Sequence, residues 1–266
     1  MHNSVSGMDV DFRLHYEDGS YQWVNLSGSI TVNEKGEQTR IVGCLHNVHQ
    51  HKMLEEAQRR KQIYDSITSF YRLGSGLEAV EKMCGKHPDG VLVILEIQHF
   101  SKIDEQYGLI FGNIILEQFA GLLAERFQAE GLADGIYIRA GADQMLVWLP
   151  KGTVIEVKKA AKKLGKDFAG LTDEKYLSLS LKGGIAVTSQ NNSLSQALEQ
   201  TKAALTAARR GKNQFVSFAE LNEEEKRDSS EAAFNEVASL ERLKEMPLSS
   251  VALNLFDREG KTSVVL

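Results

Sequence analysis

Apolar and polar residues alternate along the first fifty residues of the chain. Val10, Phe12 and Leu14 are separated by polar residues, which places the two sets on opposite faces of one strand. The Asp18-Gly19 pair that follows tolerates positive φ and offers a turn. Two further strand-like runs cover residues 21–32 and 39–48. The pattern predicts a three-stranded antiparallel meander within residues 1–50. A sheet of this size is close to the lower limit for independent stability, so we expect it to pack on another element.

Residues 51–73 form a charged segment with helical periodicity. Six apolar residues recur in it at the intervals of one helix face: Met53, Leu54, Ala57, Ile63, Ile67 and Phe70. We interpret the segment as a connecting helix that is able to pair with its copy in a homodimer.

Short apolar runs and amphipathic segments follow one another from residue 74 to residue 218. Residues 91–95 are all apolar, which is typical of a strand buried on both faces. Further strands are predicted at 177–187 and 214–218, and a hairpin at 135–150 around Gly141-Ala142-Asp143. Helical periodicity marks residues 115–127, 154–168 and 194–210, and Gly211 ends the last of these. The predicted fold class is therefore α/β (α+β), with a mixed sheet flanked by helices.

The last segment, residues 219–266, changes in character. The acidic run at 223–225 is typical of a solvated linker, a helix is predicted at 232–244, and alternation resumes as a strand from Val251. We expect this strand to open a further domain that continues beyond Leu266.

Composition narrows the class of protein. With 266 residues the chain is long enough for two domains, and no stretch approaches the ~18 apolar residues that a membrane helix needs. The first residues are neither basic nor apolar enough for a secretory signal, so we expect a cytoplasmic location. Only Cys44 and Cys84 are present, which excludes a disulfide framework. A net charge of −5 argues against a nucleic-acid partner and leaves small ligands and other proteins.

Two segments of the meander resemble a known family. Residues 15–24, with the sequence HYEDGSYQWV, and residues 41–48, with the sequence IVGCLHNV, look like the C-terminal half of a PAS sensor domain, of which the last three strands are present.

A second resemblance covers residues 62–218. Five short segments in order, at 65–71, 95–100, 107–113, 139–145 and 211–213, are similar to those of the GGDEF domain of the diguanylate cyclase family. The resemblance implies a nucleotidyl-cyclase-like mixed sheet. It also implies the family's reaction, in which two GTP molecules are joined into cyclic di-GMP and each half of a dimer holds one nucleotide.

The resemblance places a candidate site at five signature residues: Gly141, Ala142, Asp143, Gln144 and Met145. It implies that Glu96 and Asp143 hold a metal ion, which is Mg²⁺ if a nucleotide binds, because hard oxygen ligands suit this ion. It also implies that Phe100, Asp104 and Asn113 contact GTP.

Several residues depart from the family pattern. Gln144 stands where the family has an acid and cannot act as a base near neutral pH. Ala142 replaces a glycine, and positive φ there would cost on the order of 1 kcal/mol or more. Ser101 and Ala208 replace two triphosphate lysines, and Leu132 replaces the arginine of the product-inhibition motif. We therefore assign no catalytic residue.

The combination favours a bacterial signal-transduction module whose degenerate GGDEF domain scaffolds or transmits between domains. Two alternatives stay open: a weak diguanylate cyclase that uses Glu96 and Asp143, and a GTP-sensing module without turnover.

Two basic clusters receive simple interpretations. The lysines at 158–159 and 162–163 form the solvated face of a helix, and the basic residues at 209–212 complement a helix dipole.

Overall fold

The computed structural model describes residues 5–32, 38–172, 177–189, 193–228, 254–256 and 262–264. The chain divides into two compact units, Met1–Tyr64 and Asp65–Leu266, and each is considered by itself. The helix predicted at 232–244 lies outside the described residues.

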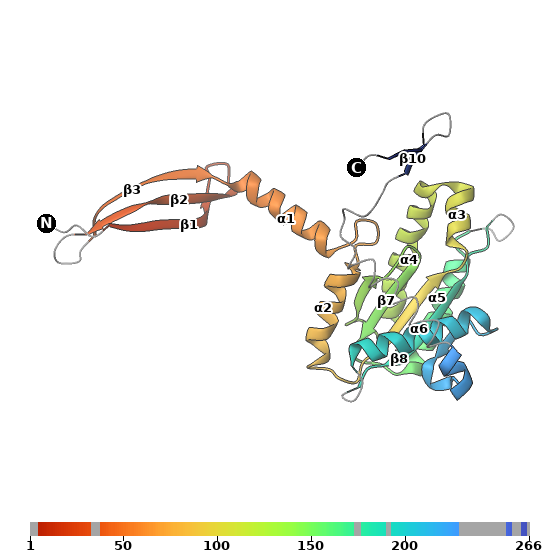
Figure 1. The fold of residues 1–266 in the computed structure, drawn as a ribbon. Helices are drawn as coiled ribbons and strands as arrows, with labels where there is room; N and C mark the ends of the chain where they lie inside the picture. Colours follow the sequence, from red (N-terminus) through yellow and green to blue (C-terminus); the bar gives the residue numbers. More distant parts are fainter. Residues whose placement is uncertain are drawn as a thin grey trace. The chain divides into compact units, whose positions relative to one another are not determined.

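The first unit contains an antiparallel sheet in the order β1-β2-β3 (Figure 1). Its strands are β1 (Val5–His15), β2 (Tyr21–Val32) and β3 (Gln38–Asn47). The predicted turn forms between β1 and β2, where Gly19 has a φ of 81° and the Ser20 N–H donates to the Asp18 carboxylate at 2.8 Å. The three-stranded meander is therefore confirmed.

Helix α1 (His49–Ile63) follows the meander, and it corrects the predicted helix 51–73. The prediction was wrong in its extent because Asp65 starts a tight turn. The Asp65 carboxylate accepts hydrogen bonds from the backbone N–H groups of Ile67 and Thr68, which offers the chain an alternative to helical bonding. A short strand, β4 (Tyr71–Arg72), comes next, followed by helix α2 (Leu73–Cys84), which the hydrophobic pattern did not predict.

A mixed sheet forms the centre of the second unit, and its six strands among the described residues follow the order β4-β6-β7-β5-β8-β9 (Figure 1). The strands other than β4 are β5 (Val91–Ile97), β6 (Ile136–Arg139), β7 (Gln144–Leu149), β8 (Leu181–Val187) and β9 (Phe215–Ser217). β5 lies between β7 and β8 and runs antiparallel to both. All residues of β5 are buried, which confirms the strand predicted from its apolar run. The predicted hairpin is confirmed by the antiparallel pairing of β6 with β7.

Helices cover both faces of this sheet and build two hydrophobic cores. On one face, α3 (Phe100–Tyr107), α4 (Leu109–Ala129) and α5 (Val154–Ala169) pack on the odd-numbered residues of β5. On the other face, α2 and α6 (Leu194–Arg210) pack on Leu92 and Ile94. Capping boxes start α5 at Thr153 and α6 at Ser193. The predicted mixed α/β fold with its three amphipathic helices is confirmed.

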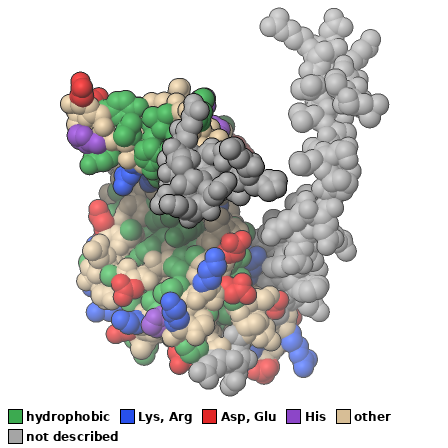
Figure 2. All heavy atoms as spheres, turned by 90° about the vertical axis from the view of Figure 1, so that its left-hand side faces the viewer, with side chains coloured by type: hydrophobic (Ala, Val, Ile, Leu, Met, Phe, Trp, Pro, Cys, Tyr) green, Lys and Arg blue, Asp and Glu red, His purple; other side chains and the backbone are tan. Residues whose placement is uncertain are grey.

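Beyond β9 the described chain holds a short 3-10 helix (Phe218–Glu220), helical residues 223–228 where the acidic run predicted a solvated linker, and a two-stranded antiparallel pair, β10 (Asn254–Phe256) with β11 (Thr262–Val264). Within the described residues, no helix is both long and apolar enough to cross a membrane. Acidic and basic side chains are interspersed over the face of the molecule in Figure 2, in keeping with the small net charge.

Candidate functional site

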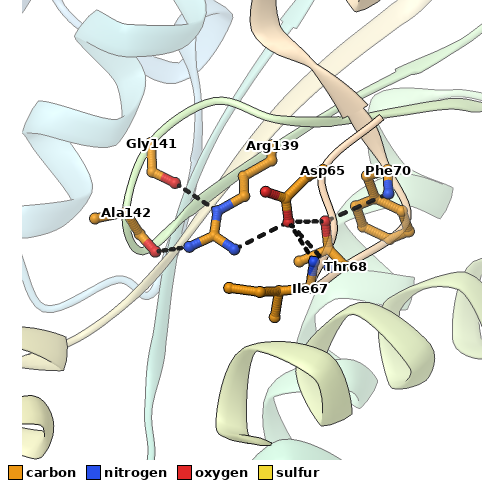
Figure 3. A network of polar contacts seen from close by, with 7 residues as sticks. All are labelled: Asp65, Ile67, Thr68, Phe70, Arg139, Gly141 and Ala142. Atoms are coloured by element: carbon orange, nitrogen blue, oxygen red, sulfur yellow. Dashed lines mark hydrogen bonds and ion pairs between the residues drawn. The ribbon is translucent and has the colours of Figure 1, made fainter. Parts of the chain in front are cut away.

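The signature residues 141–145 lie in the turn between β6 and β7 and at the start of β7. Arg139, the last residue of β6, holds this turn through its side chain (Figure 3). Its Nε donates to the carbonyl of Gly141 at 3.2 Å and its Nη2 to the carbonyl of Ala142 at 3.0 Å. The only non-glycine residues with positive φ in the described chain are Ser69 and His99. Ala142 therefore replaces the family's glycine without the backbone strain that the sequence suggested.

Arg139 also connects the turn to the residues that follow α1. Its Nη1 lies 3.1 Å from the Asp65 carboxylate, and both side chains are only 16% exposed. The same carboxylate oxygen accepts from the Thr68 backbone at 3.0 Å and from the Thr68 hydroxyl at 2.9 Å (Figure 3). Burial acts to raise the pKa of Asp65, but the hydrogen bonds from Thr68 and the positive charge of Arg139 outweigh it and lower the pKa below its ordinary value. This network is called the Asp65 network below.

Glu96, near the end of β5, is the most highly connected carboxylate of the site. The whole residue is 7% exposed and pairs in register with Gln144 of the neighbouring strand. Gln144 Nε2 donates to it at 2.9 Å and Gln98 Nε2 at 3.0 Å. Arg209, in the last turn of α6, donates through Nε at 3.1 Å to each oxygen and also through Nη2. Both oxygens of Glu96 are therefore engaged by a guanidinium and two amides.

Asp143 lies at the same end of the sheet as Glu96. Its backbone carbonyl accepts a hydrogen bond from the Ile97 N–H at 3.0 Å, which fixes the turn against the end of β5. In the part of the chain that the structure describes, no group of three or more His, Cys, Asp or Glu side chains is arranged to hold a metal ion. The structure thus brings the two predicted metal ligands to one edge, and their binding of a metal stays a prediction.

The three predicted nucleotide contacts lie on α3 and α4. Phe100 is 5% exposed and belongs to the hydrophobic core, so its ring serves packing. Asp104 lies against the backbone of Gly112, where a Cβ atom would clash with its carboxylate. Asn113 is the next residue of α4 and is exposed. Asp104 and the segment that carries Asn113 are therefore adjacent, while Phe100 is not available for stacking on a ligand.

The positions that carry phosphate-binding lysines in the family hold no cation here. Ser101 is exposed on α3, and Ala208 is fully buried on the inner face of α6. Lys182, across from Glu96 in β8, is engaged elsewhere, because its Nζ donates to the carbonyls of Ala208 at 2.6 Å and Gly211 at 2.9 Å. Lys182 therefore caps the C-terminus of α6.

A cavity of about 250 Å³ opens beside the signature turn, between α2 and α6. Its floor is formed by Ile94 and Leu146, which are almost completely buried, and Asp143 and Gln144 lie at its edge. The remaining lining is Leu73, Ala140, Gly141, Ala142, Leu198, Thr201 and Lys202. The walls are mainly apolar, which suits packing better than the binding of a triphosphate.

Sequence reasoning missed Arg209. We interpreted the basic residues at 209–212 as a complement to the helix dipole, but Arg209 of α6 forms an ion pair with Glu96 of β5. The two residues are 113 positions apart, so no local pattern links them. The one available signal was the position of Arg209, directly after the missing lysine at Ala208.

The fold and the turn define a class of protein. In its members a short hairpin that carries an acidic residue lies beside a carboxylate at the end of the central strand of the sheet. The family model of the diguanylate cyclase GGDEF domain matches residues 63–214. The chain therefore belongs to the GGDEF family, a family of cyclic di-GMP signalling domains, and the resemblance found in the sequence is confirmed.

Individual relatives agree with this assignment. The diguanylate cyclase DgcP of Pseudomonas aeruginosa is 27% identical over 168 residues, which are 60% of this chain and 24% of DgcP. This chain thus matches about a quarter of the length of that curated relative.

Two solved structures share the fold. The coiled coil and GGDEF domain of DgcB from Caulobacter crescentus, in complex with c-di-GMP, has a TM-score of 0.56 at 18% identity and covers 64% of this chain and 93% of its own. The S helix–GGDEF–EAL structure of Vibrio cholerae LapD, bound to c-di-GMP, has a TM-score of 0.53 at 16% identity and covers 70% of this chain and 46% of its own. At these identities the likeness concerns the fold alone.

Proposed function

We propose that this chain is a bacterial signal-transduction module in cyclic di-GMP signalling whose GGDEF domain regulates, scaffolds or transmits without catalysis. One observation carries the proposal: the Glu96 carboxylate is already bound by Arg209, Gln144 and Gln98. Attack of a ribose hydroxyl on an α-phosphate needs divalent ions held by carboxylates. A metal ion at Glu96 would have to displace a guanidinium that is bonded to both oxygens.

The neighbouring residues point in the same direction. Gln144 carries no charge and cannot accept a proton as a general base, and its amide instead satisfies Glu96. Ser101 and Ala208 supply no positive charge for a triphosphate. The site is therefore stabilised by contacts among its own side chains rather than poised for a nucleotide and its metal.

A transmitter role has a structural basis in the Asp65 network. Asp65 comes two residues after the end of α1, and through Arg139 it is linked to the carbonyls of the signature turn. We infer that the meander is the C-terminal half of a PAS sensor domain and that α1 connects it to the GGDEF domain. In this proposal α1 pairs with its copy in a homodimer, and the protein works in the cytoplasm.

The first test is an activity measurement. Incubation of the purified chain with GTP and Mg²⁺ or Mn²⁺ is expected to yield no cyclic di-GMP, because the carboxylate, base and phosphate contacts are all altered. Chromatography of the nucleotides, with an active diguanylate cyclase assayed in parallel, measures the result. Product above that of a no-protein control would support the alternative of a weak cyclase that uses Glu96 and Asp143.

A second candidate function is GTP sensing without turnover, with Mg²⁺ bound alongside the nucleotide. It is favoured by the placement of Asp104 next to the α4 segment that carries Asn113, since a carboxylate and an amide are able to recognise a purine.

We expect GTP binding to be weak or absent. Each lost charge-assisted hydrogen bond is worth roughly 1.5 to 3 kcal/mol, so the loss of two lysines lowers affinity at least about a hundredfold. A thermal-shift titration with GTP and Mg²⁺ checks this expectation. A dose-dependent rise in melting temperature at sub-millimolar GTP, abolished by Asp143→Ala, would establish the sensing function instead.

A further inference from the structure

The outer surface of α5 carries a stripe of lysines with one apolar residue. Ile155, Lys159, Lys162 and Lys166 recur at the spacing of a single helix face, and all four side chains are exposed. The stripe extends over the twelve residues from Ile155 to Lys166, and their eleven rises of about 1.5 Å give roughly 16 Å. Lys158 and Lys163 flank it, and the six residues line a shallow depression. They are called the lysine face of α5 below.

The buried side of α5 shows that the lysine face points to the outside of the domain. Val157, Ala161 and Leu164 are completely buried in the core of the second unit. The helix therefore lies flat on the sheet, and the lysine face points outward along its whole length. A flat surface outside the domain is able to meet the stripe at all of its residues at once.

Charge on the lysine face is only partly neutralised. Lys158 pairs with Glu220 at 2.6 Å, while Lys159, at 3.6 Å, and Lys163 share Glu130. Within the described part of the chain, no carboxylate lies within 4.0 Å of the ammonium groups of Lys162 or Lys166, although Glu220 exerts a weaker attraction on Lys162. Glu156 of the same helix also attracts Lys159, so five lysines against three carboxylates leave an excess of positive charge, on a chain whose net charge is −5.

We propose that the lysine face of α5 binds an anionic lipid surface. All five cations are lysines, which act as hydrated point charges, whereas a discrete phosphate or carboxylate is best bound by the bidentate guanidinium of arginine. Lysines on a flat helix face therefore suit a diffuse layer of negative charge. Ile155, at 80% exposure, adds an apolar side chain that is able to enter the boundary between headgroups and acyl chains.

A nucleic acid would also be attracted by these lysines but would leave Ile155 without an apolar environment, and an acidic protein would have to place an apolar side chain opposite Ile155. The lipid surface accounts for both the charge and the exposed isoleucine. This partner lies outside the proposed signalling function and does not depend on whether the GGDEF domain binds a nucleotide.

Vesicle co-sedimentation of the full chain tests the proposal. Vesicles of phosphatidylcholine mixed with phosphatidylglycerol are expected to bind the chain at an ionic strength of about 0.1 M and to release it at about 1 M, since salt screens exposed charges. Pure phosphatidylcholine vesicles should not bind it. The double variant Lys162→Gln/Lys166→Gln should bind about 30-fold more weakly, from roughly a fivefold effect per lysine near an anionic membrane. Ile155→Ser should weaken binding without changing its salt dependence.

A matched control removes the same charge elsewhere. Lys82 and Lys86 are exposed, are also four residues apart, and lie at the end of α2 and just beyond it. Lys82→Gln/Lys86→Gln should retain binding, and circular dichroism of all variants should match the parent chain. Equal binding to pure phosphatidylcholine, or an equal loss in the control variant, would overturn the proposal. So would soluble polyglutamate or duplex DNA that binds the chain more tightly than the vesicles do.

Discussion

Arg209→Gln is expected to lower the free energy of unfolding of the second unit by about 2 kcal/mol. Removal of one partner from a buried ion pair costs about 3 to 5 kcal/mol, because the remaining charge stays in the protein without compensation. The side chain of Glu96 is 9% exposed, but that of Arg209 is 34% exposed, so solvent screens part of the interaction. The expected cost therefore lies below the range for a fully buried pair, at about 2 kcal/mol.

Unfolding in urea, followed by tryptophan fluorescence, measures this effect. Trp148 of β7 is fully buried in the second unit, and Trp23 of β2 is the only other tryptophan. A Trp23→Phe background therefore makes Trp148 the sole reporter of the second unit. Arg210→Gln serves as the matched control, because Arg210 is the next residue of α6 and is exposed. It should change stability by less than about 0.5 kcal/mol.

The same variant tests the site itself. Once the guanidinium is gone, Glu96 loses the group that competes with a metal ion for its oxygens, and Mn²⁺ binding measured by electron paramagnetic resonance should increase relative to the parent chain. Glu96→Gln/Arg209→Gln should regain part of the lost stability and should not bind Mn²⁺. If Arg209→Gln left both stability and Mn²⁺ binding unchanged, the ion pair would not be what closes the site, and the proposed function would lose its main support.

The elements that sequence patterns predicted correctly are those whose patterns arise from burial. β5 was predicted because a strand covered by helices on both faces needs apolar residues throughout, and α5 and α6 because each buries one face. The errors arise from side chains that act on the backbone. Asp65 ended the helix predicted to run to residue 73 by accepting hydrogen bonds from Ile67 and Thr68.

Helix α2 was not predicted because of its glycines. Its first turns contain Gly74 and Gly76, which normally weaken a helix. Gly76 is useful here because a Cβ at this position would come within 2.6 Å of Ile138 of β6. The glycine thus permits a close approach of helix and sheet, a benefit that becomes visible only once the tertiary packing is known.

In the candidate site, too, some residues could be identified from the sequence and others could not. The resemblance to the GGDEF family singled out Glu96, Asp143 and Gln144, and the structure places these three residues at one end of the sheet. The role of Arg209 could not be predicted, since it has no counterpart in the motif and its partner lies in a strand 113 positions away. Departures from a family pattern therefore show which contacts are lost, while only the structure shows what has replaced them.

The Asp65 network supports a prediction with a defined pH dependence. Asp65→Asn keeps the size of the side chain and its carbonyl acceptor for Thr68, but it removes the charge that faces Arg139 at 3.1 Å. Because both side chains are mostly buried, the substitution is expected to cost about 1 to 2 kcal/mol at neutral pH, more than a surface ion pair and in the range of a charge-assisted hydrogen bond.

The sign of the pH effect follows from the lowered pKa of Asp65 in the folded protein. A carboxyl whose folded pKa lies below its unfolded value of about 3.9 contributes stability that is fully present above that value. The contribution is lost as the pH falls through the folded pKa, because the proton then binds both states. The difference in unfolding free energy between the parent chain and Asp65→Asn should therefore be constant from about pH 7 to pH 5 and shrink below about pH 4.

Urea unfolding of the Trp23→Phe forms across this pH range measures the difference. Asp134→Asn provides the control, because Asp134 is 74% exposed and its nearest cation, Lys151, lies 3.9 Å away in an equally open position. It should show little effect at any pH. A difference for Asp65→Asn that persisted unchanged at acidic pH would mean that shape rather than charge holds the signature turn to the residues after α1. Transmission through this contact would then have to rest on packing alone.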